Sequence, residues 1–92
     1  MKVEFDPGKS AKNDRERGLP FERAADMDWD SALIVQDARR DYGEERFLAF
    51  APMQGRLHVA CFSIRGDVFR IISFRKTNTR EEKFYAKAIA HR

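Results

Sequence analysis

The chain has 92 residues, 42% of them hydrophobic and 36% charged, and a net charge of +3, a composition typical of one globular domain over residues 1–92 rather than of a disordered segment. Its one cysteine, Cys61, excludes an intramolecular disulfide, and no apolar stretch approaches the roughly 20 residues of a membrane-spanning helix. Acidic residues follow Met1 almost at once, unlike in a signal peptide, so we expect a cytoplasmic protein that does not engage a membrane.

The N-terminal third predicts a short strand followed by two helices. Residues 3–5 are the candidate strand. Asp6 and Pro7 suit the N-cap and first turn of a helix and Gly18 suits its end, so the almost wholly polar segment between them is expected to be helical, with little apolar surface. A second short helix is expected over residues 20–27. Its apolar positions, at helical spacing, are Phe21, Ala24 and Ala25.

The middle of the chain predicts an antiparallel sheet. The four expected strands cover residues 32–35, 46–51, 56–64 and 68–75. Polar turns separate them, and Gln54-Gly55 has the composition of a tight hairpin turn. Since the connections are short, we expect a meander in which the third strand, apolar on both faces, is central.

The C-terminus predicts a last helix that packs on the sheet. Asn78 or Thr79 can cap it, with Glu81 or Glu82 completing a capping box. Its apolar stripe consists of Phe84, Tyr85, Ala88 and Ile89. The predicted fold class is therefore α+β, with N-terminal helices, a four-stranded antiparallel meander sheet and a C-terminal helix.

Positive charge is concentrated in the last part of the chain. Residues 56–92 contain nine Lys or Arg and three Asp or Glu, whereas residues 1–55 contain nine and twelve. This asymmetry indicates a surface for a polyanion. A solvated basic surface without a ligand explains the charges equally well.

The sequence offers no recognisable metal site, phosphate loop or nucleophilic triad, and no cofactor is expected. His58 and His91 are far apart in the sequence, and every glycine stands alone. Cys61 lies in the middle of an apolar strand, where a core position is the simplest interpretation. His58 is interpreted first as an ordinary strand histidine and only second as a general base.

A group of cations remains, near the end of the last strand and the start of the last helix. Strict strand alternation places Ser73 and Arg75 on one face, with Phe69 and Ile71, and Arg70 and Lys76 on the other. Arg80, in the first helical turn, would point to the same place as Arg75, where a helix N-terminus favours a phosphate. Such a cluster could stabilise the transition state of RNA cleavage, because RNA supplies its own nucleophile in the 2′-hydroxyl. Structural roles are the alternative: Arg75 could pair with Glu81, and Arg70 could be a solvent-facing strand residue.

Several ordered motifs resemble the BrnT family of bacterial type II toxins along essentially the whole chain. They are Phe5-Asp6-Pro7-x-Lys9-x-x-x-Asn13, Gly18-x-x-Phe21-Glu22-x-Ala24, Asp41-Tyr42-Gly43-Glu44-x-Arg46-Phe47, Arg70-Ile71-Ile72-Ser73-x-Arg75-Lys76 and Arg80-Glu81-x-x-x-Tyr85. The resemblance implies a RelE-like fold and endoribonuclease activity that inhibits translation and growth. It also implies a BrnA-type antitoxin with a ribbon-helix-helix DNA-binding region, through which alone the complex would contact operator DNA.

The family's functional positions are best matched by Arg75 and Arg80, with Arg65 and Lys76 as supporting cations. Together with the cations found above, the predicted catalytic residues are Arg65, Ser73, Arg75 and Arg80, and the predicted RNA contacts are Arg56, Arg70, Lys76 and Lys83. The leading hypothesis is metal-independent cleavage of RNA. The alternative is a non-catalytic module that binds RNA or a protein partner.

Overall fold

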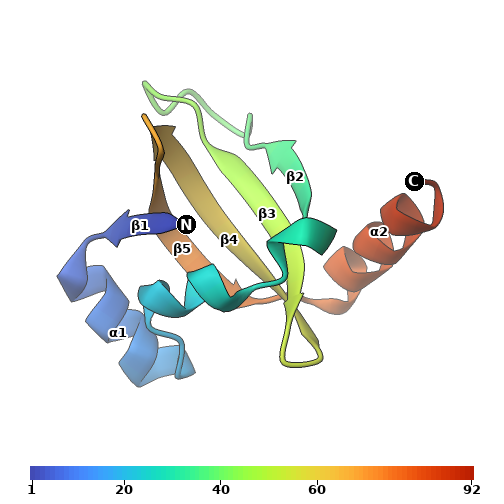
Figure 1. Ribbon diagram of the computed structural model, residues 1–92, viewed down its shortest axis with the longest axis horizontal. Coiled ribbons are helices and arrows are strands. Elements are labelled where there is room, and N and C mark those ends of the chain that lie inside the picture. The colour runs from blue at the N-terminus through green and yellow to red at the C-terminus, as the bar shows by residue number, and fades with distance from the viewer.

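The computed structural model describes residues 1–92 as five strands, two α-helices and two short 3-10 helices (Figure 1). The strands are Lys2–Phe5 (β1), Leu33–Gln36 (β2), Phe47–Met53 (β3), Arg56–Arg65 (β4) and Val68–Lys76 (β5). The helices are Pro7–Arg17 (α1), Phe21–Asp26 (η1), Trp29–Ser31 (η2) and Thr79–Ala90 (α2). None of them is long and apolar enough to cross a membrane.

The strands form one mixed sheet in the order β1-β5-β4-β3-β2. Strands β2 to β5 are the predicted antiparallel meander. Strand β1 adds a fifth, parallel member beside β5, with Val3 opposite Phe69, so the prediction of a purely antiparallel four-stranded sheet is wrong. The strand at residues 3–5 was evident in the sequence, but a local pattern does not tell which sheet edge a strand joins.

The first helix follows its predicted signals. The Asp6 carboxylate accepts hydrogen bonds from the N–H groups of Gly8 (2.8 Å) and Lys9 (3.2 Å), and Gly18 ends the helix at a φ of 69°. The second predicted helix is instead the 3-10 helix η1. Phe21 and Ala24, three residues apart, are its buried positions, which suits three residues per turn.

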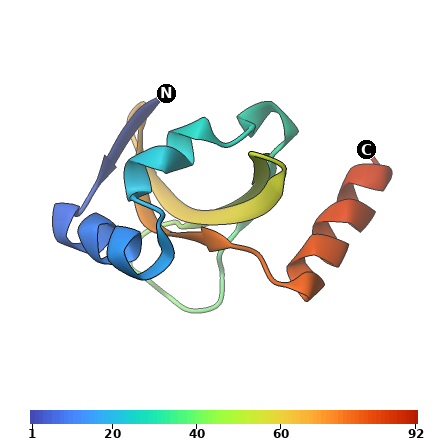
Figure 2. The ribbon, with the colours of Figure 1, turned by 90° about the horizontal axis from the view of Figure 1, so that it is seen from below.

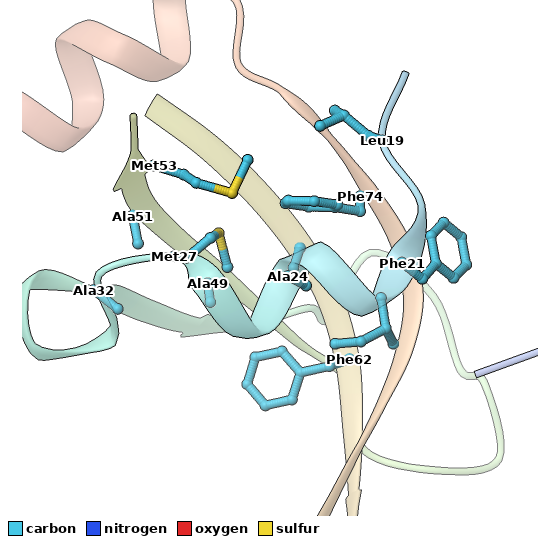
Figure 3. Close-up of a cluster of buried hydrophobic side chains, with 12 residues drawn as sticks. Leu19, Phe21, Ala24, Met27, Ala32, Ala49, Ala51, Met53, Phe62 and Phe74 are labelled. Carbon is cyan, nitrogen blue, oxygen red and sulfur yellow. The ribbon is translucent and has the colours of Figure 1, made fainter. Parts of the chain in front are cut away.

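The core lies between η1 and one face of the sheet (Figure 3). Twelve buried apolar residues form it, and Phe62 and Phe74 are among the most completely buried. Trp29 extends this core, with its ring stacked on Phe69 at 5.6 Å and edge-on to Phe62 at 5.7 Å. We call this side of the sheet the covered face.

A β-bulge in β5 decides which side chains share the opposite face. Cys61 pairs with Ser73, but the next residue, Phe62, pairs with Ile71, so Ile72 is an extra residue. Arg70 consequently lies opposite Ser63, on the same face as Ser73 and Arg75. The prediction from strict alternation, which separated Arg70 from Ser73 and Arg75, is therefore wrong. We call this face, which carries Asp37, Arg46, Cys61, Ser63, Arg65, Arg70, Ser73 and Arg75, the outer face.

Helix α2 stands beside the β2 end of the sheet (Figures 1 and 2). Its predicted capping box is confirmed at Asn78 and Glu81. The expectation that it packs on the sheet holds only locally, because no residue of α2 is buried and Phe84 is 47% exposed. Phe84 contacts the ring of Phe50 at 5.7 Å, and the Tyr85 hydroxyl donates a hydrogen bond to the Ser31 carbonyl (2.7 Å).

Candidate functional site

A buried carboxylate anchors the connection between β2 and β3 to the outer face. Arg39 donates two hydrogen bonds to Asp37 (2.7 and 2.8 Å), and the Tyr42 hydroxyl donates a third (3.2 Å). The Asp37 side chain is 1% exposed, and chiefly the Arg39 bonds lower its pKa to about 2. The Cys61 thiol lies 3.9 Å away, and burial raises its pKa. Asp37 is therefore a weak base with a structural role.

The same connection holds two further arginines. The Arg46 guanidinium lies over the Tyr42 ring at 4.0 Å from its centroid. The Glu44 carboxylate lies 3.6 Å from Arg46 and 3.7 Å from Arg65, so the two arginines share one negative charge. The Nε of Arg46 and the Oγ of Ser63 are buried without a hydrogen-bond partner.

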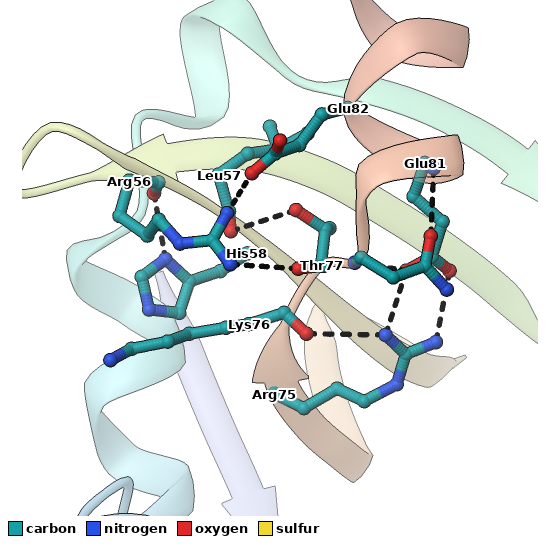
Figure 4. Close-up of polar contacts among 9 residues, drawn as sticks. Arg56, Leu57, His58, Arg75, Lys76, Thr77, Glu81 and Glu82 are labelled. Carbon is teal, nitrogen blue, oxygen red and sulfur yellow. Dashed lines mark hydrogen bonds and ion pairs between the residues drawn. The ribbon is translucent and has the colours of Figure 1, made fainter.

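Arg75 is fixed at the start of α2 (Figure 4). It donates two hydrogen bonds to Glu81 (2.8 and 2.9 Å), which raise the pKa of Arg75 and lower that of Glu81. The Glu81 carboxylate also accepts from the Asn78 N–H (3.0 Å). Ser73 is exposed two residues earlier on the same face, and Arg80 is exposed in the first turn of α2 without an ion pair.

A basic pocket of about 370 Å³ lies at the end of the covered face, where α1 ends and the β3–β4 hairpin turns. It is lined by Arg17, Gly18, Leu19, Arg23, Met53, Gln54, Arg56, His58 and Lys76. Four of these are cations and none is a carboxylate. Arg56 is bound to Glu82 and donates to the Thr77 carbonyl (2.8 Å), as Figure 4 shows. The other three cations form no ion pair.

His58 lines this pocket as a neutral base. Its side chain is buried, and Nδ1 lies 2.8 Å from the Arg56 carbonyl oxygen, which can only accept, so Nδ1 carries the hydrogen (Figure 4). Nε2 is then an acceptor, and it has no partner within the chain. Burial lowers the pKa of His58, and the charges of Lys76, Arg56 and Arg23 lower it further, against the opposing effect of the Arg56 carbonyl.

The predicted site residues are partly brought together. Ser73, Arg75 and Arg80 lie around the start of α2, whereas Arg65 lies at the far end of the sheet, opposite Val68. Their catalytic roles stay predictions.

The predicted RNA contacts are also divided. Arg56 and Lys76 line the pocket, Lys83 is exposed on α2, and Arg70 on the outer face is 3.2 Å from Glu4. Sequence reasoning missed Arg17 and Arg23 as site residues. Only the turn at Gly18, which folds η1 back beside α1, brings them to β5, and no local motif marks that meeting.

Residues 5–81 match the model of a family described as the ribonuclease toxin, BrnT, of type II toxin-antitoxin systems. A comparison with curated proteins finds no match. The family match covers most of the 92 residues and includes every motif on which the resemblance rested, except the final Tyr85.

Proposed function

The chain belongs to the BrnT family of ribonuclease toxins of type II toxin-antitoxin systems, and we propose that it is an endoribonuclease that cleaves RNA in the cytoplasm without a metal ion. In the proposed reaction the ribose 2′-oxygen forms a bond to the adjacent phosphorus, and the bond from phosphorus to the 5′-oxygen breaks. The 2′-hydroxyl loses its proton to a base, the 5′-oxygen gains one, and a 2′,3′-cyclic phosphate remains. Loss of RNA would then inhibit translation and growth.

The observation that carries this proposal is the cluster of cations on both sides of the end of β5. Lys76 points into the basic pocket with Arg17 and Arg23, while the neighbouring residue Arg75 lies with Arg80 at the start of α2. An RNA strand that crosses this junction meets phosphate-binding groups on either side.

Within this cluster we propose that Arg75 and Arg80 bind the scissile phosphate and that Ser73 assists from the same face. The two hydrogen bonds to Glu81 fix the Arg75 guanidinium before substrate arrives. A cation fixed in advance stabilises the charge that develops on the phosphate oxygens without reorganising during the reaction. Arg65, at the other end of the sheet, would contact a distant part of the substrate.

The test is cleavage of RNA by the purified chain in the presence of EDTA, with analysis of the product ends. We expect unchanged cleavage and a 2′,3′-cyclic phosphate or 3′-phosphate. A divalent-metal requirement for the chemical step would contradict the proposed mechanism. Binding of RNA without any cleavage would favour the non-catalytic alternative.

We further propose a BrnA-type ribbon-helix-helix antitoxin as the partner that neutralises the toxin and carries the complex to operator DNA. Carboxylates satisfy phosphate-binding arginines with the same bidentate geometry, so an acidic segment of the antitoxin can cover the cluster. The association rate should then fall as salt rises. An association rate independent of salt would show that inhibition acts elsewhere.

A further inference from the structure

We propose that the basic pocket binds one ribose-phosphate unit of an RNA strand, with the phosphate on Arg17, Arg23 and Lys76 and the ribose 2′-hydroxyl donating a hydrogen bond to Nε2 of His58. This inference rests on the proposed ribonuclease function. It adds a second subsite, which is separate from the arginines at the start of α2 and recognises the ribose.

The charges of the pocket are available to a ligand. Every arginine on the outer face already forms an ion pair with a carboxylate, as Arg70 does with Glu4 and Arg75 with Glu81. Arg17, Arg23 and Lys76 have no such partner, and no acidic residue lines the pocket. Like charges gathered in one cavity repel one another, so an anion that enters it relieves this repulsion.

The size of the pocket favours a ligand larger than a free anion. Its volume of about 370 Å³ lies at the lower end of the range for small-molecule sites, which is roughly 300–1,000 Å³. Leu19 and Met53 add apolar surface beside the cations. A sugar with its phosphate has both the charge and the bulk that these walls accommodate.

His58 specifies a hydrogen-bond donor next to the phosphate. Its Nδ1 hydrogen is engaged by the Arg56 carbonyl, so Nε2 can only accept. Phosphate oxygens are acceptors too, and they would not bind a neutral imidazole through Nε2. The ribose 2′-hydroxyl is the donor nearest to a 3′-phosphate in RNA, and DNA lacks it.

Mononucleotides separate this inference from the cleavage reaction, because a 3′-mononucleotide has no strand to cut. Calorimetric titration compares adenosine 3′-phosphate, 2′-deoxyadenosine 3′-phosphate and inorganic phosphate. We expect the ribonucleotide to bind roughly fivefold more tightly than the deoxynucleotide, the value of one net hydrogen bond. Equal affinities for the ribonucleotide and the deoxynucleotide would overturn the ribose assignment, and the absence of binding would overturn the subsite.

Variants assign the two parts of the ligand. Arg23→Ala and Lys76→Ala should weaken binding of both nucleotides, while Arg15→Ala, exposed in the same last turn of α1 as Arg17 and outside the pocket, should not. His58→Phe should remove only the preference for ribose, with His58→Gln as the second variant if the first fails to fold by circular dichroism. Equal losses in Arg15→Ala and Arg23→Ala, or a preserved ribose preference in both His58 variants, would contradict the proposal.

The outcomes also separate the two proposals. Cleavage of RNA in EDTA by a chain that binds no mononucleotide would leave the ribonuclease function standing and refute the subsite. Mononucleotide binding with a ribose preference, in a chain that never cleaves RNA, would support the subsite and refute the catalytic function.

Discussion

The arginines of the outer face and the cations of the basic pocket differ in what they face. On the outer face, Arg46 and Arg65 share Glu44, and Arg75 is bound by Glu81. In the pocket, Arg23 and Lys76 line the same cavity, and no carboxylate lines it with them. Each arginine of the outer face therefore has a carboxylate beside it, whereas in the pocket only Arg56 is paired, with Glu82, and three cations remain for a ligand.

A count of basic residues therefore does not locate a phosphate site. An arginine that already holds a carboxylate either offers its remaining N–H groups to a phosphate or exchanges that partner, and an exchange costs part of the binding free energy. Arg75 is the informative case, because it is paired and is also one of the four predicted catalytic residues.

The largest effect is expected from Arg75→Ala. Loss of one charged donor to the developing phosphate charge costs on the order of 3 kcal/mol, or about a hundredfold in the cleavage rate. Single-turnover cleavage of RNA measures this, and circular dichroism checks that the fold is intact.

The matched variant is Glu81→Gln, which frees Arg75 but keeps a side-chain oxygen for the Asn78 N–H. If Arg75 serves the phosphate, Glu81→Gln retains far more activity than Arg75→Ala. If a folded Arg75→Ala variant cleaved RNA at the wild-type rate, the ion pair of Arg75 with Glu81 would serve only to hold α2 in place.

A second effect, on stability, is expected from Asp37→Asn. The substitution removes the charge that Arg39 and Tyr42 bind in a buried position, so the free energy of unfolding should fall by about 1–3 kcal/mol. Because the pKa of Asp37 is lowered from 3.8 to about 2, its contribution is complete above pH 3.8 and is lost as the pH falls through about 2.

Urea unfolding at pH 7 measures the loss, with Asp30→Asn, at an exposed position, as the control. If the two variants had the same free energy of unfolding, the buried pair of Asp37 with Arg39 would not stabilise the fold.

The sequence predicts those features that neighbouring residues decide. Asp6 and Gly18 bound α1, Gln54 and Gly55 turn the hairpin with φ values of 51° and 75°, and Asn78 caps α2. Each of these signals acts within a few residues, so it can be recognised without knowing the fold.

Features decided by distant partners could not be predicted in the same way. The parallel pairing of β1 depends on the free edge of β5, and the bulge at Ile72 is defined only by the pairing of β5 with β4. The bulge moves Arg70 to the face of Arg75, and the turn at Gly18 brings Arg23 near Lys76. Residue types therefore indicate a basic surface, but its division into paired and unpaired charges requires the fold.

A third prediction concerns His58 and pH. Burial among the cations Arg23, Arg56 and Lys76 lowers its pKa below 6.5, so the unfolded chain binds the proton more readily than the folded one. The stabilising contribution is present above pH 6.5 and is lost as the pH falls from 6.5 toward the lowered value.

Urea unfolding at pH 7.5 and 5.5 should show a decrease that His58→Gln removes and that His91→Gln, at an exposed position, retains. If the decrease persists in His58→Gln, another group titrates, and the pocket does not hold a neutral imidazole.

The smallest effect is a difference between two single arginines. Arg70 is paired with Glu4, and both side chains are partly exposed, so Arg70→Ala should change stability by less than about 1 kcal/mol and nucleic-acid affinity little. Arg23 is unpaired, so Arg23→Ala should remove a phosphate contact.

A DNA oligonucleotide, which lacks the 2′-hydroxyl and so cannot be cleaved by this mechanism, reports affinity alone. On a single strand, loss of one phosphate contact reduces the magnitude of the slope of log affinity against log salt by about 0.7. That change should occur in Arg23→Ala and not in Arg70→Ala. The opposite result would mean that the carboxylates of the outer face yield readily to phosphate, as the prediction of Arg70 as an RNA contact requires.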